Sequence, residues 1–130
     1  KEIKFYSSAF KNVRFQGFVR NPLINHINDN SIYIIPSNYG EGLPRGILEA
    51  ICLGIPVIAT KNASAYNFNE NNVFLINDNE VNSMCIAINK IKDLIIKNKL
   101  ISHLLNAKSF VEKNYTEEII VRDTLSTYFN

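Results

Sequence analysis

The sequence predicts an α/β fold with a parallel sheet flanked by helices, followed by a wholly helical C-terminal part. Up to residue 76, short apolar runs alternate with helical patterns, which is the order of a parallel sheet joined by right-handed crossovers. After that point, apolar residues recur at three- and four-residue intervals, as they do in helices. We expect a single domain, because 130 residues suffice to bury one core.

The first expected elements are a helical remnant over Glu2–Phe10, a strand near Val13–Gly17 and a short helix over Pro22–Asn28. A strand over Ile32–Ile35 follows, because this apolar run ends at turn-forming residues. A loop that contains glycine then leads into a helix. That helix is expected to end at Gly54, since glycine readily adopts the left-handed conformation that terminates helices.

Two further strands and two long helices complete the predicted core. Apolar strands are expected over Pro56–Ala59 and Val73–Ile76, and helices over Glu80–Asn98 and Leu100–Lys113. The first of these helices carries an apolar stripe of the kind that packs against a sheet. The stripe consists of Val81, Met84, Ile88, Ile91 and Ile95.

A last helix is expected after Thr116, because a threonine hydroxyl suits the N-cap position. Glu117 and Glu118 would lie in its first turn, where the helix dipole favours negative charge. The apolar side of this helix would consist of Ile119, Ile120, Leu125, Tyr128 and Phe129.

Composition excludes several classes of function. With 46% hydrophobic and 20% charged residues, the chain has the composition of a soluble globular domain, and no apolar run is long enough to span a bilayer. A net charge of +2 with scattered basic residues argues against a nucleic-acid partner. His26 and His103 are isolated from other ligand residues, so we expect no metal centre. Cys52 and Cys85 fall in apolar helical stretches, and we expect buried core thiols in a reducing compartment.

The most informative segment is Ser37–Ala50, where a loop that contains glycine opens a helix directly after a strand. Open α/β sheets bind ligands at this position, because loop backbone and helix N-terminus converge outside the strand ends. Pro44 suits the first turn of the helix, since its fixed φ is already helical. The amides around Gly42 and Leu43 then face outward, where the helix dipole favours an anion such as phosphate.

Two glutamates in this segment, Glu41 and Glu49, are separated by seven residues. Glu49 has apolar neighbours, so its carboxylate needs a partner, and sugar hydroxyls are good partners because a carboxylate accepts from two O–H groups at once. In the alternative interpretation, Glu41 complements the helix dipole and Glu49 pairs with Arg45, a surface arrangement that contributes roughly a few tenths of a kcal/mol. The spacing alone leaves both interpretations open.

The runs Glu41–Pro44, Leu48–Ala50 and Gly54–Thr60 follow one another in a specific combination, and Asn12–Val19 precedes them with a strand pattern and a glycine turn. Together these segments resemble the signature of the retaining glycosyltransferases of the GT-B fold, specifically family four, the group 1 glycosyl transferases. The resemblance covers most of the chain between Asn12 and Ile76. It implies a Rossmann-like sheet, with residues 1–130 forming a single, partial C-terminal domain that binds the sugar donor.

The resemblance also implies roles for individual residues. Glu41, the candidate catalytic residue, is expected to position the donor sugar, and Glu49 is expected to bind the ribose hydroxyls of the nucleotide. The amides of Gly42 and Leu43 would meet the donor sugar or its diphosphate. The candidate donor-binding residues are Gly17, Phe18, Gly42, Leu43, Pro44, Arg45 and Glu49.

Two of these residues have plain alternatives, and one segment departs from the family. Gly17 and Phe18 are implied beside the base, but Phe18 also suits a buried core position, which we favour. Arg45 either reaches a phosphate or lies in solvent, and we favour solvent. Residues Lys61–Asn67 replace a loop that in the family often carries paired glycines and an acidic residue, so this loop gives no donor or acceptor preference.

The implied reaction is retaining transfer of a sugar from a nucleotide diphosphate donor to an acceptor hydroxyl. No metal or other cofactor is expected, because the motif takes the place of the Asp-rich metal site found in the other glycosyltransferase fold class. The favoured donor is a UDP-sugar. The favoured process is synthesis of a bacterial surface polysaccharide, such as capsule, lipopolysaccharide or exopolysaccharide, in the cytoplasm or peripherally at the inner face of the plasma membrane.

The acceptor, a glycan or a lipid-linked sugar, would be bound by a missing N-terminal domain, so this chain alone is expected to be inactive. In such enzymes the final helix often crosses back to the other domain, and an exposed apolar patch on it here would mark a missing partner. Two other classes remain open: a domain like that of sugar-nucleotide epimerases, and a noncatalytic Rossmann-like module that binds a nucleotide or a protein.

Overall fold

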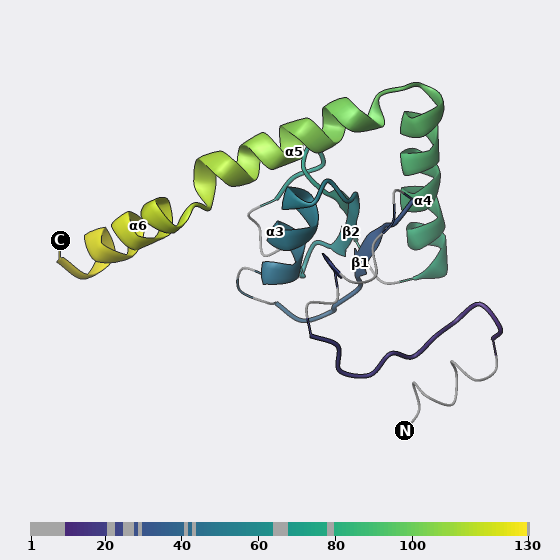
Figure 1. Ribbon diagram of the computed structural model, residues 1–130, viewed down its shortest axis with the longest axis horizontal. Coiled ribbons are helices and arrows are strands. Elements are labelled where there is room, and N and C mark those ends of the chain that lie inside the picture. The colour runs from purple at the N-terminus through teal and green to yellow at the C-terminus, as the bar shows by residue number, and fades with distance from the viewer. Residues whose placement is uncertain are drawn as a thin grey trace.

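The computed structural model describes residues 10–20, 23–24, 28, 30–40, 42, 44–63, 68–77 and 80–129. Along the chain these described residues form three strands and four helices (Figure 1). They are β1 (Tyr33–Ile35), α3 (Arg45–Cys52), β2 (Val57–Thr60), β3 (Phe74–Ile76), α4 (Val81–Ile96), α5 (Leu100–Asn114) and α6 (Glu117–Phe129). The predicted α/β fold with a helical C-terminal part is confirmed. The helices predicted over Glu2–Phe10 and Pro22–Asn28 lie almost wholly outside the described residues, although Leu23 and Ile24 are helical.

The three strands form a parallel sheet in the order β1-β2-β3. In the register, Ile34 of β1 lies beside Ile58 of β2, and Ile58 in turn lies beside Phe74 of β3. All four residues of β2 are buried, as suits a central parallel strand that is covered on both faces. Each strand matches its predicted position to within one residue at either end.

Helices cover both faces of the sheet (Figure 1). Alternate residues of β2 point to opposite faces, so Val57 and Ala59 pack with α3 and the second half of α5, whereas Ile58 packs with α4. The buried residues of α4 are Ala87 and Ile91. The core therefore has two halves, one on each side of β2.

Helix α3 begins directly after Pro44 and is closed by Gly54. Pro44 is buried and its carbonyl accepts the N–H of Ile47 at 3.0 Å. Gly54 has a φ of 73°, and the N–H of Ile55 returns to the carbonyl of Ala50 at 2.9 Å. This left-handed closure confirms the role predicted for Gly54 and turns the chain straight into β2.

Helix α4 has a narrower contact face than its sequence pattern predicted. Val81 and Ile95, two of the five predicted stripe residues, are 77% and 55% exposed. The three-residue strand β3 spans about 10 Å, whereas a helix of 16 residues spans about 24 Å, so the ends of α4 extend past the sheet. The observed face instead consists of Met84, Ala87, Ile88, Ile91 and Leu94.

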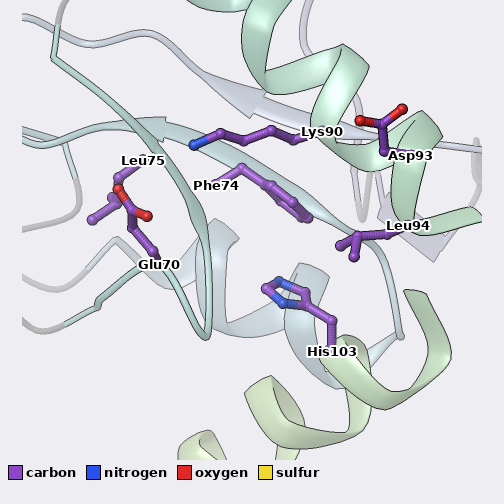
Figure 2. A pocket seen from close by; sticks show the side chains of 7 residues that line it. All are labelled: Glu70, Phe74, Leu75, Lys90, Asp93, Leu94 and His103. Atoms are coloured by element: carbon purple, nitrogen blue, oxygen red, sulfur yellow. The ribbon is translucent and has the colours of Figure 1, made fainter. Parts of the chain in front are cut away.

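Helix α5 is tied to the sheet at both ends. Near its start, the imidazole of His103 lies against the ring of Phe74 in β3, with ring centroids 4.6 Å apart (Figure 2). Near its end, Phe110 and Tyr115 contact Phe68, which precedes β3, at centroid distances of 6.0 and 5.9 Å. Burial raises the pKa of the Tyr115 phenol.

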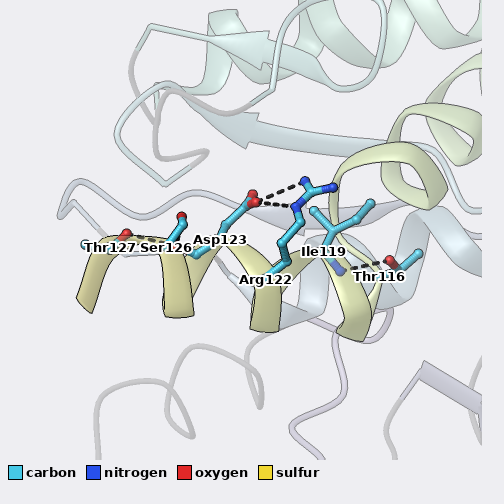
Figure 3. A network of polar contacts seen from close by, with 6 residues as sticks. All are labelled: Thr116, Ile119, Arg122, Asp123, Ser126 and Thr127. Atoms are coloured by element: carbon cyan, nitrogen blue, oxygen red, sulfur yellow. Dashed lines mark hydrogen bonds and ion pairs between the residues drawn. The ribbon is translucent and has the colours of Figure 1, made fainter. Parts of the chain in front are cut away.

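Helix α6 leaves the body of the molecule (Figure 1). Its N-cap is Thr116, as predicted, because the Thr116 hydroxyl accepts the N–H of Ile119 at 3.4 Å. Its polar contacts are local: Arg122 pairs with Asp123 at 2.9 Å, and two hydroxyls donate to the Asp123 carbonyl (Figure 3). Four apolar side chains on this helix are exposed, namely Ile120, Val121, Leu125 and Tyr128. No helix in the described part of the chain is both long and apolar enough to span a bilayer.

The strand predicted near Val13–Gly17 is wrong. Residues 10–20 contain no strand, and most of this segment runs apart from the sheet in Figure 1. Strands are stabilised by backbone hydrogen bonds to a neighbour, and no strand of the described sheet pairs with this segment. Phe18 is 98% exposed, so its favoured core interpretation is wrong as well. Gly17 has a φ of 69°, and the chain bends at the next residue.

Both cysteines are exposed, which corrects the expectation of buried core thiols. Cys52 follows the buried Ala50 by two residues, and Cys85 precedes the buried Ala87 by two. Two residues correspond to roughly 200° around a helix, so each thiol lies on the face opposite to the core. Apolar neighbours in the sequence do not reveal this, because adjacent residues point about 100° apart around a helix, and Leu53 and Ile86, which follow the two cysteines, are themselves exposed.

Candidate functional site

The loop after β1 lies at the carboxyl edge of the sheet, where the sequence predicted a ligand site. Within it, the N–H of Tyr39 donates to the hydroxyl of Ser37 at 3.3 Å, which forms a tight turn. Gly42 is exposed, and a Cβ at this position would have no heavy atom within 4 Å. Glu41 and Leu43 lie outside the described residues. The backbone at Gly42 is thus open to a ligand from the outside.

Thr60, the last residue of β2, joins this loop to the loop after β2. Its side chain is 1% exposed, and its hydroxyl donates to the carbonyl of Ser37 in a short hydrogen bond. The same hydroxyl accepts the N–H of Ala63 at 3.2 Å. Nearby, the amide of Asn62 donates to the carbonyl of Asn38 at 3.2 Å. These contacts fix the two loops relative to each other at the edge of the sheet.

Tyr33 of β1 packs against the first turn of α3 at Gly46. A Cβ built on Gly46 would overlap the Tyr33 hydroxyl and lie 3.0 Å from the ring carbon Cζ. Glycine therefore allows the strand and the start of the helix to approach closely. Sequence reasoning missed both Thr60 and Tyr33 as site-shaping residues. One signal was available, since a glycine inside a helix costs about 1 kcal/mol relative to alanine and indicates a close approach.

Glu49 lies on the second turn of α3 with an exposed carboxylate. It borders a cavity of about 310 Å³ whose other walls include Leu23, Ile24, Cys52 and Leu53. Among the described residues, its side chain makes neither a hydrogen bond nor an ion pair. The pairing with the residue one turn earlier, proposed in the alternative interpretation, is therefore not formed. The carboxylate is free to accept hydrogen bonds from a ligand.

The other predicted site residues are distributed along the first half of the chain. Arg45 is exposed at the start of α3, which agrees with the favoured solvent position. Gly17 and Phe18 belong to the segment that runs mostly apart from the sheet. In the parts of the chain that the structure describes, no three His, Cys, Asp or Glu side chains form a group able to hold a metal ion. The geometry thus brings together Gly42, Pro44, Arg45 and Glu49 on one short helix and its entry loop.

The site thus consists of a strand, a loop held in place by Thr60, and a helix whose Glu49 carboxylate has no partner among the described residues. The comparison with protein families shows which family has this sequence. The family described as glycosyl transferases group 1 matches residues 1–93. The chain belongs to this family. The matched range contains the sheet, α3 and most of α4, so this α/β core is a glycosyltransferase domain. No curated protein and no solved structure matches the chain.

Proposed function

We propose that this glycosyltransferase domain is the donor-binding, C-terminal half of a retaining GT-B enzyme of family four. The observation that carries the proposal is the unpaired, exposed carboxylate of Glu49 beside a cavity of about 310 Å³. An ionised carboxylate accepts from the two adjacent hydroxyls of a ribose, and such charge-assisted bonds are stronger than neutral ones. The donor is a nucleotide diphosphate sugar, and we favour UDP as the nucleotide.

The diphosphate would lie at the start of α3. When the sugar is transferred, negative charge grows on the departing diphosphate, and amides that already point at that charge lower the barrier without having to reorganise. The open backbone at Gly42 and the N-terminus of α3 supply such groups, and the loop is held in place by the buried hydroxyl of Thr60. Glu41 and Leu43 complete the proposed site, with Glu41 as the residue that positions the sugar.

The acceptor, a glycan or a lipid-linked sugar, would be bound by a second domain. The exposed apolar side of α6 supports this part of the proposal, because an apolar helix face that leaves the body of the molecule is suited to pack on a partner domain. We place the whole enzyme in synthesis of a bacterial surface polysaccharide in the cytoplasm, with peripheral association at the inner face of the plasma membrane.

The test is ligand-observed NMR of this chain with UDP, GDP, ADP and their glucose-bearing forms, on the wild type and Glu49→Ala. Loss of charge-assisted hydrogen bonds to a ribose should weaken binding by roughly 1.5–3 kcal/mol, which is about 10- to 150-fold. Glu112→Ala is the matched control, because Glu112 is also an exposed helical glutamate but lies on α5. Equal affinity in Glu49→Ala and Glu112→Ala would contradict the role of Glu49. Absence of binding by any of these nucleotides at millimolar concentration would contradict the donor-binding assignment.

A further inference from the structure

A second cavity, of about 390 Å³, lies at the opposite edge of the sheet from the motif loop. Its walls come from the start of β3, the second half of α4, the first turn of α5 and the turn before β3 (Figure 2). Its size falls within the range of about 300–1,000 Å³ that is typical of pockets for small ligands. Two of the lining residues, Leu94 and His103, lie beyond the range 1–93 that the family matches.

The imidazole of His103 lines one side of this cavity (Figure 2). It extends from α5 into the space beside Phe74, and its Nε2 atom is buried with no hydrogen-bond partner in the described part of the chain. A buried polar atom without a partner costs free energy, and such atoms are rare in folded proteins. Burial also lowers the pKa of His103, so the ring is neutral and one ring nitrogen donates while the other accepts.

Charged groups of both signs surround this neutral ring. Lys90 extends from α4 across Phe74 toward the side of the cavity where Glu70 lies (Figure 2). Glu70 belongs to a turn that is already ordered: the side chain of Asn69 accepts the N–H of Asn71 at 2.9 Å. Neither Lys90 nor Glu70 forms an ion pair or hydrogen bond with another described residue. The lining of the cavity therefore includes an ammonium donor, two carboxylates, those of Glu70 and Asp93, and an imidazole.

We propose that this cavity binds a sugar ring, at a site separate from the proposed donor site. A sugar ring carries several hydroxyls that both donate and accept, which matches an unpaired carboxylate, an ammonium and a neutral imidazole around one space. Its C–H faces suit the apolar surface of Phe74 and Leu94, which lie on the same side of the sheet as His103. A purely anionic ligand fits less well, because Glu70 would repel it and burial opposes protonation of His103.

The cavity beside His103 lies at the amino edge of the strands, away from the motif loop. Phe74 begins β3, whereas the motif loop follows the carboxyl end of β1, so the two sites lie at opposite edges of the same parallel sheet. A sugar bound beside His103 would not compete with a donor at Glu49. Such a site would allow the domain to hold a glycan while sugar is transferred from a donor bound at the donor site.

The test is two-dimensional NMR of the His103 ring during titration with methyl glycosides of glucose, galactose and N-acetylglucosamine, and separately with inorganic phosphate and UDP. We expect at least one glycoside to shift the His103 ring resonances saturably in the millimolar range, while UDP leaves them unchanged. Lys90→Met should weaken that binding about fivefold, the effect of one lost hydrogen bond. Lys97→Met, an exposed lysine beyond the end of α4, is the matched control and should bind like wild type.

Three variants test the proposal: His103→Phe, Lys90→Met and Glu49→Ala. His103→Phe should abolish the glycoside response seen on neighbouring amides, whereas Lys90→Met should only weaken it, and Lys90 is exposed, so this variant leaves the core intact. Retention of the response in Glu49→Ala supports two separate sites. The proposal is wrong if no glycoside gives a saturable shift at high millimolar concentration, if phosphate shifts the ring instead, or if Lys90→Met and Lys97→Met bind alike.

Discussion

Replacing Gly46 with alanine tests whether the start of α3 depends on close packing against β1. The added Cβ would overlap the hydroxyl of Tyr33 and lie 3.0 Å from ring carbon Cζ and 3.5 Å from Cε1. Because an aromatic ring is rigid, the whole side chain must move, and we take the upper part of the range for overpacking, about 2–3 kcal/mol. Alanine also returns about 1 kcal/mol of helix propensity. The expected net loss in the free energy of unfolding is therefore about 1–2 kcal/mol.

The assay is urea unfolding followed by circular dichroism, with the substitution also made in a Tyr33→Phe background. Removing the hydroxyl relieves the worst overlap, so Gly46→Ala should cost less in that background, and the difference is the coupling energy of the pair. Gly40→Ala is the control, since a Cβ there has no heavy atom within 4 Å. If Gly46→Ala instead stabilises both backgrounds by about 1 kcal/mol, helix propensity alone decides the outcome and the packing argument is refuted.

Three further predictions concern the edges of the sheet. Gly42→Val should leave the urea midpoint unchanged, because its side chain enters open space, and should weaken binding of UDP-glucose in the NMR titration; unchanged affinity would remove this loop from the donor site. Thr60→Val should cost about 1–3 kcal/mol in urea unfolding by leaving the Ser37 carbonyl and Ala63 N–H unpaired, whereas Thr124→Val on exposed α6 should be neutral. Burial lowers the pKa of His103 below 6.5, so the folded state binds its proton more weakly than the unfolded state. Stability should be fully present above pH 6.5 and fall as the pH drops through that value, and urea midpoints that show the same acid loss in His103→Gln would contradict this.

Residues close together in the sequence predicted most of the strands and helices. The three strands follow apolar runs bounded by turn residues, and the helices α4, α5 and α6 end within about two residues of their expected limits. Gly54 closes α3 in the left-handed region because it has no Cβ, and the hydroxyl of Thr116 forms the N-cap of α6. These features depend on residues close together in the sequence, so a single sequence is enough to identify them.

Predictions that depend on distant partners were less successful. The pattern at Val13–Gly17 suits a strand, but a strand forms only where another strand accepts its hydrogen bonds, and the sequence does not say whether one is present. The same applies to α4, because the short β3 covers only its middle and leaves Val81 and Ile95 exposed. Propensity describes what a segment can form, whereas burial depends on what lies beside it.

In the candidate site, too, some residues follow from a local motif and others depend on contacts with distant parts of the chain. Glu49 and Gly42 were found because the motif lies within one stretch of chain, and their positions on α3 and its entry loop follow from that stretch alone. Thr60, on the neighbouring strand β2, and Tyr33, on β1 itself, shape the same candidate site through contacts with Ser37 and Gly46. Candidate ligand-binding residues can thus be proposed from a local motif, but Thr60, which fixes the motif loop, is separated from that motif by a strand crossover. A buried hydroxyl at the end of the neighbouring strand and a ring packed on a helical glycine therefore indicate how rigid this loop is.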